Sequence, residues 1–193
     1  MFFIKNMIAV NNKEAATSMI MNLASYYRYV TRLEHTMTSL QEELELIEHY
    51  LVIQNLRLER FHYEIDIPDQ MLTLRVPRLL IQPIVENTII HSIEKYGRYG
   101  IIEISGERKG DDCLIIVDDN GSEIADGLIQ QLQKKIDRPV EEGEGFGLWN
   151  VHQRLRYQFG QEAGLRFAHS PLGGLRVMIR WNDSGVGDAE GGK

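Results

Sequence analysis

Cysteine is nearly absent from this chain, and basic residues are outnumbered by acidic ones. Cys113 is the single cysteine in 193 residues, which excludes a disulfide framework and suits a reducing compartment. The chain carries 21 lysines and arginines against 28 aspartates and glutamates, a formal net charge of -7. Because nucleic acid attracts proteins through basic surface, we expect no nucleic-acid partner.

Long apolar runs are also missing. No stretch reaches the roughly 18 apolar residues that would predict a membrane-spanning helix. The opening segment Met1–Lys5 is too short for a signal peptide. The composition, 43% hydrophobic and 25% charged, is that of an ordinary globular protein. The length fits one large domain, or one domain with a helical extension.

Three common phosphate-binding signatures are absent. No Gly-Lys-Ser/Thr occurs, so there is no P-loop. The segment Gly145-Phe146-Gly147 lacks the third glycine and the preceding strand of a dinucleotide-binding unit. The catalytic-loop and metal-loop signatures of protein kinases are missing as well. A nucleotide site in this chain would need a different construction.

The first 60 residues carry helical signals. Residues 3–31 have helical spacing with a break at Asn11-Asn12, and a capping box over Ser39–Glu42 starts a second helix. That second helix has a heptad seam, made of Leu40, Leu44, Ile47, Leu51, Gln54 and Leu58. Four acidic residues lie off the seam and are expected in solvent: Glu42, Glu43, Glu45 and Glu48. The seam fits a hairpin within one chain and a helical dimer interface equally well.

From residue 61 the pattern changes to strand, helix, strand, strand, helix, loop, helix, strand, strand. Phe61–Ile67 alternates with period two, Pro77 suits the first turn of the next helix, and Pro83 should kink that helix. Further strands are expected over 101–108, 114–117, 165–169 and 175–181, helices over 124–136 and 148–159, and a loop over 137–145. Adjacent strands predict an α+β fold, a two-layer sandwich of a mixed sheet with helices on one face.

The expected domains follow from this change of pattern. Residues 1–60 form a helical region, 61–181 the α+β domain, and 182–193 a small, polar tail expected to be disordered.

The helix around residues 79–91 is apolar except for Gln82, Glu86, Asn87 and His91. Asn87 and His91 stand four apart and share one helical face. Buried polar groups need partners, so taken alone this is a core helix with satisfied polar residues. Two glycine-rich segments downstream change that interpretation.

Asp119 ends an apolar strand, where a buried carboxylate can accept a hydrogen bond from the exocyclic amine of adenine. Gly145 and Gly147 allow close backbone approach at the start of a helix, whose N–H groups favour phosphate. Asn87 offers a carbonyl oxygen to Mg²⁺. Each motif alone is better explained as a turn, a hinge or a core amide; their combination in this order is not.

Together these stretches resemble the nucleotide-binding boxes of the GHKL ATP-binding fold, also called the Bergerat fold, in the form found in LytS/YesM-type bacterial sensor histidine kinases. The matching segments are 82–91 for the N-box, 117–121 for the first glycine box, and 145–151 with 154–155 for the second. Tyr27-Arg28-Tyr29 and residues 44–54 resemble the linker helices of that family. The similarity extends to about Trp181.

The resemblance implies an enzyme, an ATP:protein-histidine phosphotransferase that uses ATP and Mg²⁺. Asn87 would bind Mg²⁺, Asp119 would hold adenine, and Glu86 would act in catalysis. Other nucleotide-binding candidates are His91, Gly121, Gly145, Gly147, Leu148 and Asn150. The loop over 137–145 would be a short lid.

The resemblance also implies partners and a location. The family's phosphoryl group passes from ATP to a histidine and then to a response regulator. A homodimer through the N-terminal helices is expected. The fragment would be cytoplasmic, with the full-length protein held in the bacterial cell membrane by upstream sequence.

Three departures from the family pattern bear on this hypothesis. Glu123 replaces a glycine, Gly174-Leu175 replaces a Gly-Thr pair, and none of the six histidines stands in the family's phosphoacceptor context. We therefore expect no autophosphorylation by this fragment. One alternative is a GHKL-shaped interaction module with a degenerate pocket, and another is a related ATPase or serine kinase.

Overall fold

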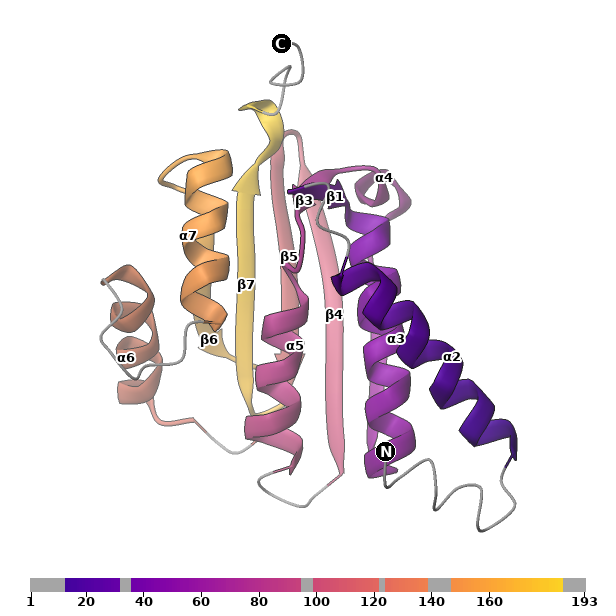
Figure 1. The fold of residues 1–193 in the computed structure, drawn as a ribbon. Coiled ribbons are helices and arrows are strands. Elements are labelled where there is room, and N and C mark those ends of the chain that lie inside the picture. The colour runs from indigo at the N-terminus through magenta and orange to yellow at the C-terminus, as the bar shows by residue number, and fades with distance from the viewer. Residues whose placement is uncertain (1–12, 32–35, 95–98, 122–123, 139–146, 186–193) are drawn as a thin grey trace, which may run out of the picture.

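The computed structural model describes residues 13–31, 36–94, 99–121, 124–138 and 147–185 (Figure 1). A five-stranded mixed sheet has the order β2-β4-β5-β7-β6. Its strands are β2 (Phe61–Asp66), β4 (Gly100–Lys109), β5 (Asp112–Asp119), β6 (Gly164–His169) and β7 (Leu175–Asn182). The β2–β4 pair is parallel, and the other pairs are antiparallel.

Helices α5 (Gln82–Thr88), α6 (Asp126–Asp137) and α7 (Gly147–Phe159) lie on one side of this sheet (Figure 1). The predicted α+β sandwich of a mixed sheet with helices on one face is therefore confirmed. The expected lid and tail fall almost wholly outside the described residues. After β7 the described chain ends in the 3-10 turn η2 (Asp183–Gly185).

The N-terminal helices α2 (Lys13–Val30) and α3 (Leu40–Leu58) form a hairpin beside the sheet (Figure 1). The predicted capping box is present: the Ser39 hydroxyl accepts from the Glu42 N–H at 3.2 Å, and the Glu42 carboxylate accepts from the Ser39 N–H at 3.3 Å. Such a cap stabilises a helix N-terminus by about 1 kcal/mol. At the other end Glu59 closes α3 in the left-handed conformation, with φ of 51°.

The heptad seam of α3 packs into the main core. Leu40, Leu44, Ile47 and Leu51 are buried in one hydrophobic cluster together with residues of the sheet and α5. The hairpin has only a small cluster of its own, around Ala16 and Met19. The expectation for Glu43 is wrong: this side chain is 0% exposed, because the segment before α5 covers it.

Two predictions about proline are also wrong. Pro77 does not open a helix but ends β3 (Arg75–Pro77), which pairs with β1 (Met37–Ser39) in a two-stranded sheet. Pro83 does not kink α5, because it lies in the first helical turn, where its missing N–H costs nothing. The short β1, β3 and helix α4 (Asp69–Leu72) are too brief to leave a periodic pattern.

The irregularity lies at the C-terminal end of α5. After Thr88 the chain continues as a π-helical segment, η1 (Ile89–Glu94). A π segment turns the side chains that follow it relative to an α-helix. Asn87 is half-buried, while His91, four residues on, is exposed.

Candidate functional site

A cavity of about 740 Å³ opens between α5, η1, α6, α7 and the strands β5 and β7. Six residues selected from the sequence line it: Glu86, Asn87, His91, Asp119, Gly147 and Leu148. Apolar side chains from the sheet and from α6 complete the wall: Val177, Leu175, Leu128, Leu132 and Ile136. Its volume lies within the range of small-molecule sites, roughly 300–1,000 Å³, and a mostly apolar wall with few polar anchors is typical of them.

Asp119 is the buried anion of this cavity, at 2% exposure. Its Oδ1 accepts the N–H groups of Gly121 at 2.6 Å and Leu175 at 3.3 Å, and the Ser92 hydroxyl also donates to the carboxylate. Burial raises the pKa of Asp119, and these donors act in the opposite direction. The carboxylate is thus fixed in orientation at the cavity wall, where it can accept a further donor.

Gly174 is needed for this arrangement. A Cβ on Gly174 would lie 2.1 Å from Asp119 Oδ1 and 2.5 Å from the Gly121 nitrogen. The Gly174 N–H also donates to the Asp119 carbonyl at 3.1 Å. Where the family has threonine, this chain contacts Asp119 through the backbone N–H of Leu175, which every residue type except proline provides.

Asn87 faces the start of α7. Its Nδ2 donates to the Pro83 carbonyl at 2.6 Å, which directs the amide oxygen away from the helix backbone. A Cβ on Gly147 would lie 3.9 Å from both Asn87 Nδ2 and Pro83 Cβ, an ordinary van der Waals distance, so the start of α7 lies close to α5 here. Asn87 and Gly147 both line the cavity, so a ligand there can contact the amide and the start of α7 together.

Glu86 is held by the linker helix. The Tyr26 hydroxyl donates to Glu86 Oε1 at 3.3 Å, and Gln82 Nε2 donates to the same oxygen at 2.7 Å. Burial, followed by the charge of Glu86, raises the pKa of Tyr26 to about 12. Tyr26 therefore stays a hydroxyl donor at neutral pH, and it orients this carboxylate.

Among the described residues, two that were predicted for the site lie apart from the cavity wall. Gly121 is buried behind it, bonded to Asp119. Asn150 lines a neighbouring groove of about 580 Å³, which shares Pro83 and Gly147 with the cavity. Gly145 lies outside the described residues, as does Glu123.

Several lining residues have no motif that predicts them. Lys135 of α6 brings a positive charge to the cavity, and Ser92 contacts Asp119. Trp149 lines it too, while its Nε1 donates to the Arg138 carbonyl at 2.8 Å and so joins the start of α7 to the end of α6. The amphipathic spacing of α6 marked an inner face but gave no reason to single out Lys135.

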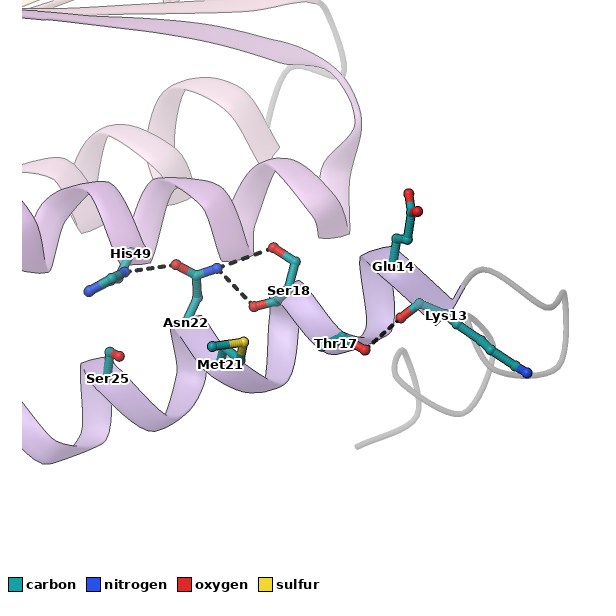
Figure 2. A pocket seen from close by; sticks show the side chains of 8 residues that line it. All are labelled: Lys13, Glu14, Thr17, Ser18, Met21, Asn22, Ser25 and His49. Carbon is teal, nitrogen blue, oxygen red and sulfur yellow. Dashed lines mark hydrogen bonds between the residues drawn. The ribbon is translucent and has the colours of Figure 1, made fainter.

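A second, shallower groove lies on the hairpin (Figure 2). There Asn22 Nδ2 donates to the Ser18 carbonyl at 2.8 Å, and Asn22 Oδ1 lies 2.7 Å from His49 Nδ1. This polar chain ties α2 to α3. None of the residues predicted for the nucleotide site lines this groove.

Two family models match the chain. The model described as histidine kinase covers residues 1–61, and the model described as histidine kinase-, DNA gyrase B-, and HSP90-like ATPase covers residues 75–185. In the part of the chain that the structure describes, no helix is both long and apolar enough for a membrane span.

Curated relatives are sensor kinases. The sensor histidine kinase YesM of Bacillus subtilis is 30% identical over 170 residues, which is 88% of this chain and 28% of YesM. BtsS of Escherichia coli is 29% identical over 175 residues, 89% of this chain and 29% of BtsS. The chain thus spans less than a third of the length of these relatives.

Solved structures share the fold. The catalytic domain of histidine kinase ThkA superposes with a TM-score of 0.59 at 16% identity, covering 78% of this chain and 98% of that domain. The ATP-binding domain of PrrB from Mycobacterium tuberculosis gives 0.54 at 19% identity, with the same coverage. ThkA in complex with the response regulator TrrA gives 0.58 at 14% identity, covering 94% of this chain and 51% of that one.

The family match over residues 75–185 coincides with the domain that holds the cavity, and the histidine kinase match coincides with the hairpin. The chain therefore belongs to the histidine kinase-, DNA gyrase B- and HSP90-like ATPases, as the ATP-binding portion of a LytS/YesM-type sensor histidine kinase.

Proposed function

We propose that the cavity binds Mg²⁺-ATP, with adenine at Asp119 and the triphosphate between Asn87 and the start of α7. The observation that carries this proposal is the buried Asp119 carboxylate at the wall of a largely apolar cavity. Adenine is flat and apolar apart from its edge, and its exocyclic amine is a donor that a carboxylate accepts well.

The residues present fit a magnesium ion that is held mainly by phosphate. The Asn87 amide oxygen is its protein ligand in this proposal, because Mg²⁺ binds few protein groups and takes the rest of its shell from phosphate and water. Among the described residues no group of three or more His, Cys, Asp or Glu side chains forms a metal site. Bound Mg²⁺ would neutralise phosphate charge, and Lys135 adds positive charge at the same wall.

The reaction we propose is transfer of the γ-phosphoryl group of ATP to a histidine, and from it to a response regulator. The names of YesM and BtsS, and the complex of ThkA with TrrA, support this assignment. Phosphoryl transfer depends mostly on positioning and charge neutralisation. Glu86 is oriented by Tyr26 and Gln82. It would take a proton from the attacking histidine, or order a water beside the γ-phosphate.

We also propose a homodimer through the N-terminal helices. Three large apolar side chains are exposed along α2: Ile20 at 50%, Met21 at 66% and Tyr27 at 58%. Burying such side chains is favourable, and a second copy of the hairpin would cover them. We propose in addition that the full-length protein is held in a membrane.

Titration with a fluorescent ATP analogue tests nucleotide binding. We expect Mg²⁺-dependent binding by the parent chain, a loss of at least tenfold in affinity for Asp119→Ala, and a reduced Mg²⁺ dependence for Asn87→Ala. Asp111→Ala, an exposed acid in the turn before β5, is the matched control and should bind like the parent. A parent chain without Mg²⁺-dependent binding would refute the proposal.

None of the six histidines is followed by Phe-Leu. We therefore propose that the 193-residue chain binds ATP without labelling itself. Incubation with γ-labelled ATP should leave no acid-labile phosphate on the chain, and labelling of any of its histidines would contradict this.

The second candidate is an interaction module of the same shape with a degenerate nucleotide pocket. Leu175 at the family's threonine position favours it. It predicts dimerisation with no effect of nucleotide on thermal stability. A rise of several degrees in Tm on adding Mg²⁺-ATP would exclude it, since a ligand stabilises only the state that binds it.

A further inference from the structure

Glu43 of α3 is a fully buried carboxylate outside the cavity, at 0% exposure. It accepts the backbone N–H groups of Leu79 at 2.6 Å, Leu80 at 2.8 Å and Ile81 at 3.4 Å. The Tyr29 hydroxyl of α2 donates to it at 2.6 Å. Burial raises the pKa of Glu43, while these four donors favour its charged form. Glu43 of α3 therefore binds three of the four residues that lead into α5, and the fourth, Arg78, donates through Nη2 to the Tyr29 carbonyl of α2.

Arg154 of α7 binds the same segment from the other side. Its Nη2 donates to the Leu79 carbonyl at 2.8 Å, and its Nη1 donates to the Arg78 carbonyl. The N–H groups of the segment thus face an anion from the hairpin, and its carbonyl groups face a cation from α7. A guanidinium fork suits two neighbouring carbonyl oxygens, because its donors are fixed in one plane.

Leu79, between the two charged residues, has φ of 55°, in the left-handed region that a leucine rarely adopts. Such a conformation persists only where the surroundings over-determine it. Here its N–H is held by Glu43 and its carbonyl by Arg154. Loss of either contact would therefore allow the backbone at Leu79 to leave the left-handed conformation.

This segment leads directly into the cavity wall. Pro83, Glu86 and Asn87 follow within two turns, and the start of α7, seven residues before Arg154, lines the cavity at Gly147. A shift of residues 78–81 would therefore move two parts of the cavity wall, Asn87 and Gly147.

We propose that the junction of Glu43, Leu79 and Arg154 couples nucleotide occupancy of the cavity to docking of the α2–α3 hairpin. This inference rests on the proposed function and adds its regulation. The docked hairpin holds α5 and α7 in the arrangement that forms the cavity, so docking and nucleotide binding favour each other. Because coupling between sites is reciprocal, a change at either side is felt at the other.

Hydrogen exchange with and without a non-hydrolysable Mg²⁺-ATP analogue measures this coupling. In the parent chain the nucleotide should slow exchange of the α3 amides over 44–51, which do not line the cavity. Glu43→Gln should bind the analogue at least fivefold more weakly and lose that slowing, consistent with typical coupling of 5- to 150-fold. Glu45→Gln, exposed on the same helix, is the matched control and should behave like the parent.

A second variant guards against a folding defect of Glu43→Gln. Arg154→Lys keeps the charge but loses the planar fork, and it should weaken analogue binding and the α3 response similarly. The double variant should lose no more affinity than the stronger single one, because both break one linked unit. Additive losses would overturn the coupling.

The outcomes separate the two proposals. A parent chain that binds the analogue with no change in α3 exchange overturns the coupling and leaves the nucleotide site intact. A Glu43→Gln chain that keeps the parent's affinity and exchange response overturns it too. A parent that binds no analogue refutes the proposed function, and the coupling with it.

Discussion

At the scale of single residues, Asp119 owes its orientation to its neighbours. Two backbone N–H groups and a serine hydroxyl fix the carboxylate, and Gly174 leaves the space in which it lies. A prealigned acceptor loses little entropy when a ligand arrives. It also prefers a donor such as the exocyclic amine of adenine to the carbonyl of guanine, which it would repel.

The raised pKa of Asp119 makes nucleotide binding sensitive to acid. The pKa of Asp119 in the folded state lies above 3.8, so protonation begins at a higher pH than for an ordinary aspartate. The affinity for Mg²⁺-ATP should therefore fall as the pH falls through this raised pKa. A charge-assisted hydrogen bond is worth about 1.5–3 kcal/mol, so the loss should be roughly tenfold or more. Titrations of Mg²⁺-ATP against pH, compared with purine riboside triphosphate, check this.

Purine riboside triphosphate lacks the exocyclic amine and serves as the control, because its own phosphates titrate like those of ATP. Without nucleotide, the pH dependence of folding stability has the sign expected for a carboxyl group whose pKa is raised on folding. Between 3.8 and the raised value, the folded state binds the proton more tightly, so this residue's contribution to stability grows as pH falls. Identical pH profiles for the two nucleotides would contradict the assignment of Asp119 to adenine.

Leu79 provides a test of strain that does not depend on nucleotide. Leu79→Ala and Leu79→Gly remove the same side-chain contacts, apart from one methyl group. Only glycine adopts φ of 55° without steric cost, so Leu79→Gly should be more stable than Leu79→Ala by about 1 kcal/mol. Urea denaturation of both variants measures the difference. At an unstrained position in a helix or strand, the alanine variant is more stable than the glycine variant. If Leu79→Ala were the more stable of the two, the backbone at Leu79 would not be strained.

Some of these residues were accessible to sequence analysis and others were not. Asp119, Asn87 and Gly147 were found because short motifs mark them, and the structure brings them to one cavity. The heptad pattern predicts Glu43 in solvent, because such a pattern describes only the contacts of one helix with one partner. Its burial depends on a segment 36 residues away, and no local pattern encodes that contact.

At the scale of elements, long periodic segments were predicted well and short ones were not. The strands over 101–108 and 175–181 and the helix over 148–159 match β4, β7 and α7 closely. The three-residue strands β1 and β3 exist only because they pair with each other. The π segment η1 likewise has no signature in an apolar run such as Ile89-Ile90.

The end of α3 offers a second backbone prediction. Glu59 is exposed and left-handed, and its N–H donates to the Asn55 carbonyl, which is a position that glycine usually occupies. Glu59→Gly should raise the free energy of unfolding by about 0.5–1 kcal/mol. Glu48→Gly, exposed within the same helix, should lower it by about 1 kcal/mol. Thermal denaturation of both variants checks the sign, and a loss of stability in Glu59→Gly would contradict it.

At the scale of the whole molecule, the order of strands and helices was enough to predict the fold class. Adjacent strands required antiparallel pairs, and helices between them had to cover one face of the sheet. The relation of the hairpin to the sheet was harder to predict. A boundary near residue 60 treats the first helices as a separate domain, yet α3 shares one hydrophobic cluster with β4, β5 and α5.

This shared core predicts that the described chain unfolds as one unit. Leu51 of α3 is 0% exposed within the main cluster, whereas Leu56 packs against the small cluster of Ala16 and Met19. Leu51→Ala should cost about 2–5 kcal/mol and lower both the far-UV circular dichroism midpoint and the fluorescence midpoint of Trp181 in β7. Leu56→Ala should cost less. Trp149→Phe in the background leaves Trp181 as the single tryptophan, whose emission can be excited apart from that of the tyrosines. If Leu51→Ala shifted the helical signal while Trp181 kept the parent midpoint, α3 would belong to a separate domain, as the boundary near residue 60 predicts. If both midpoints shifted together, α3 would belong to the same folding unit as the sheet. The proposed coupling through Glu43, Leu79 and Arg154 requires that α3 and the sheet form one unit.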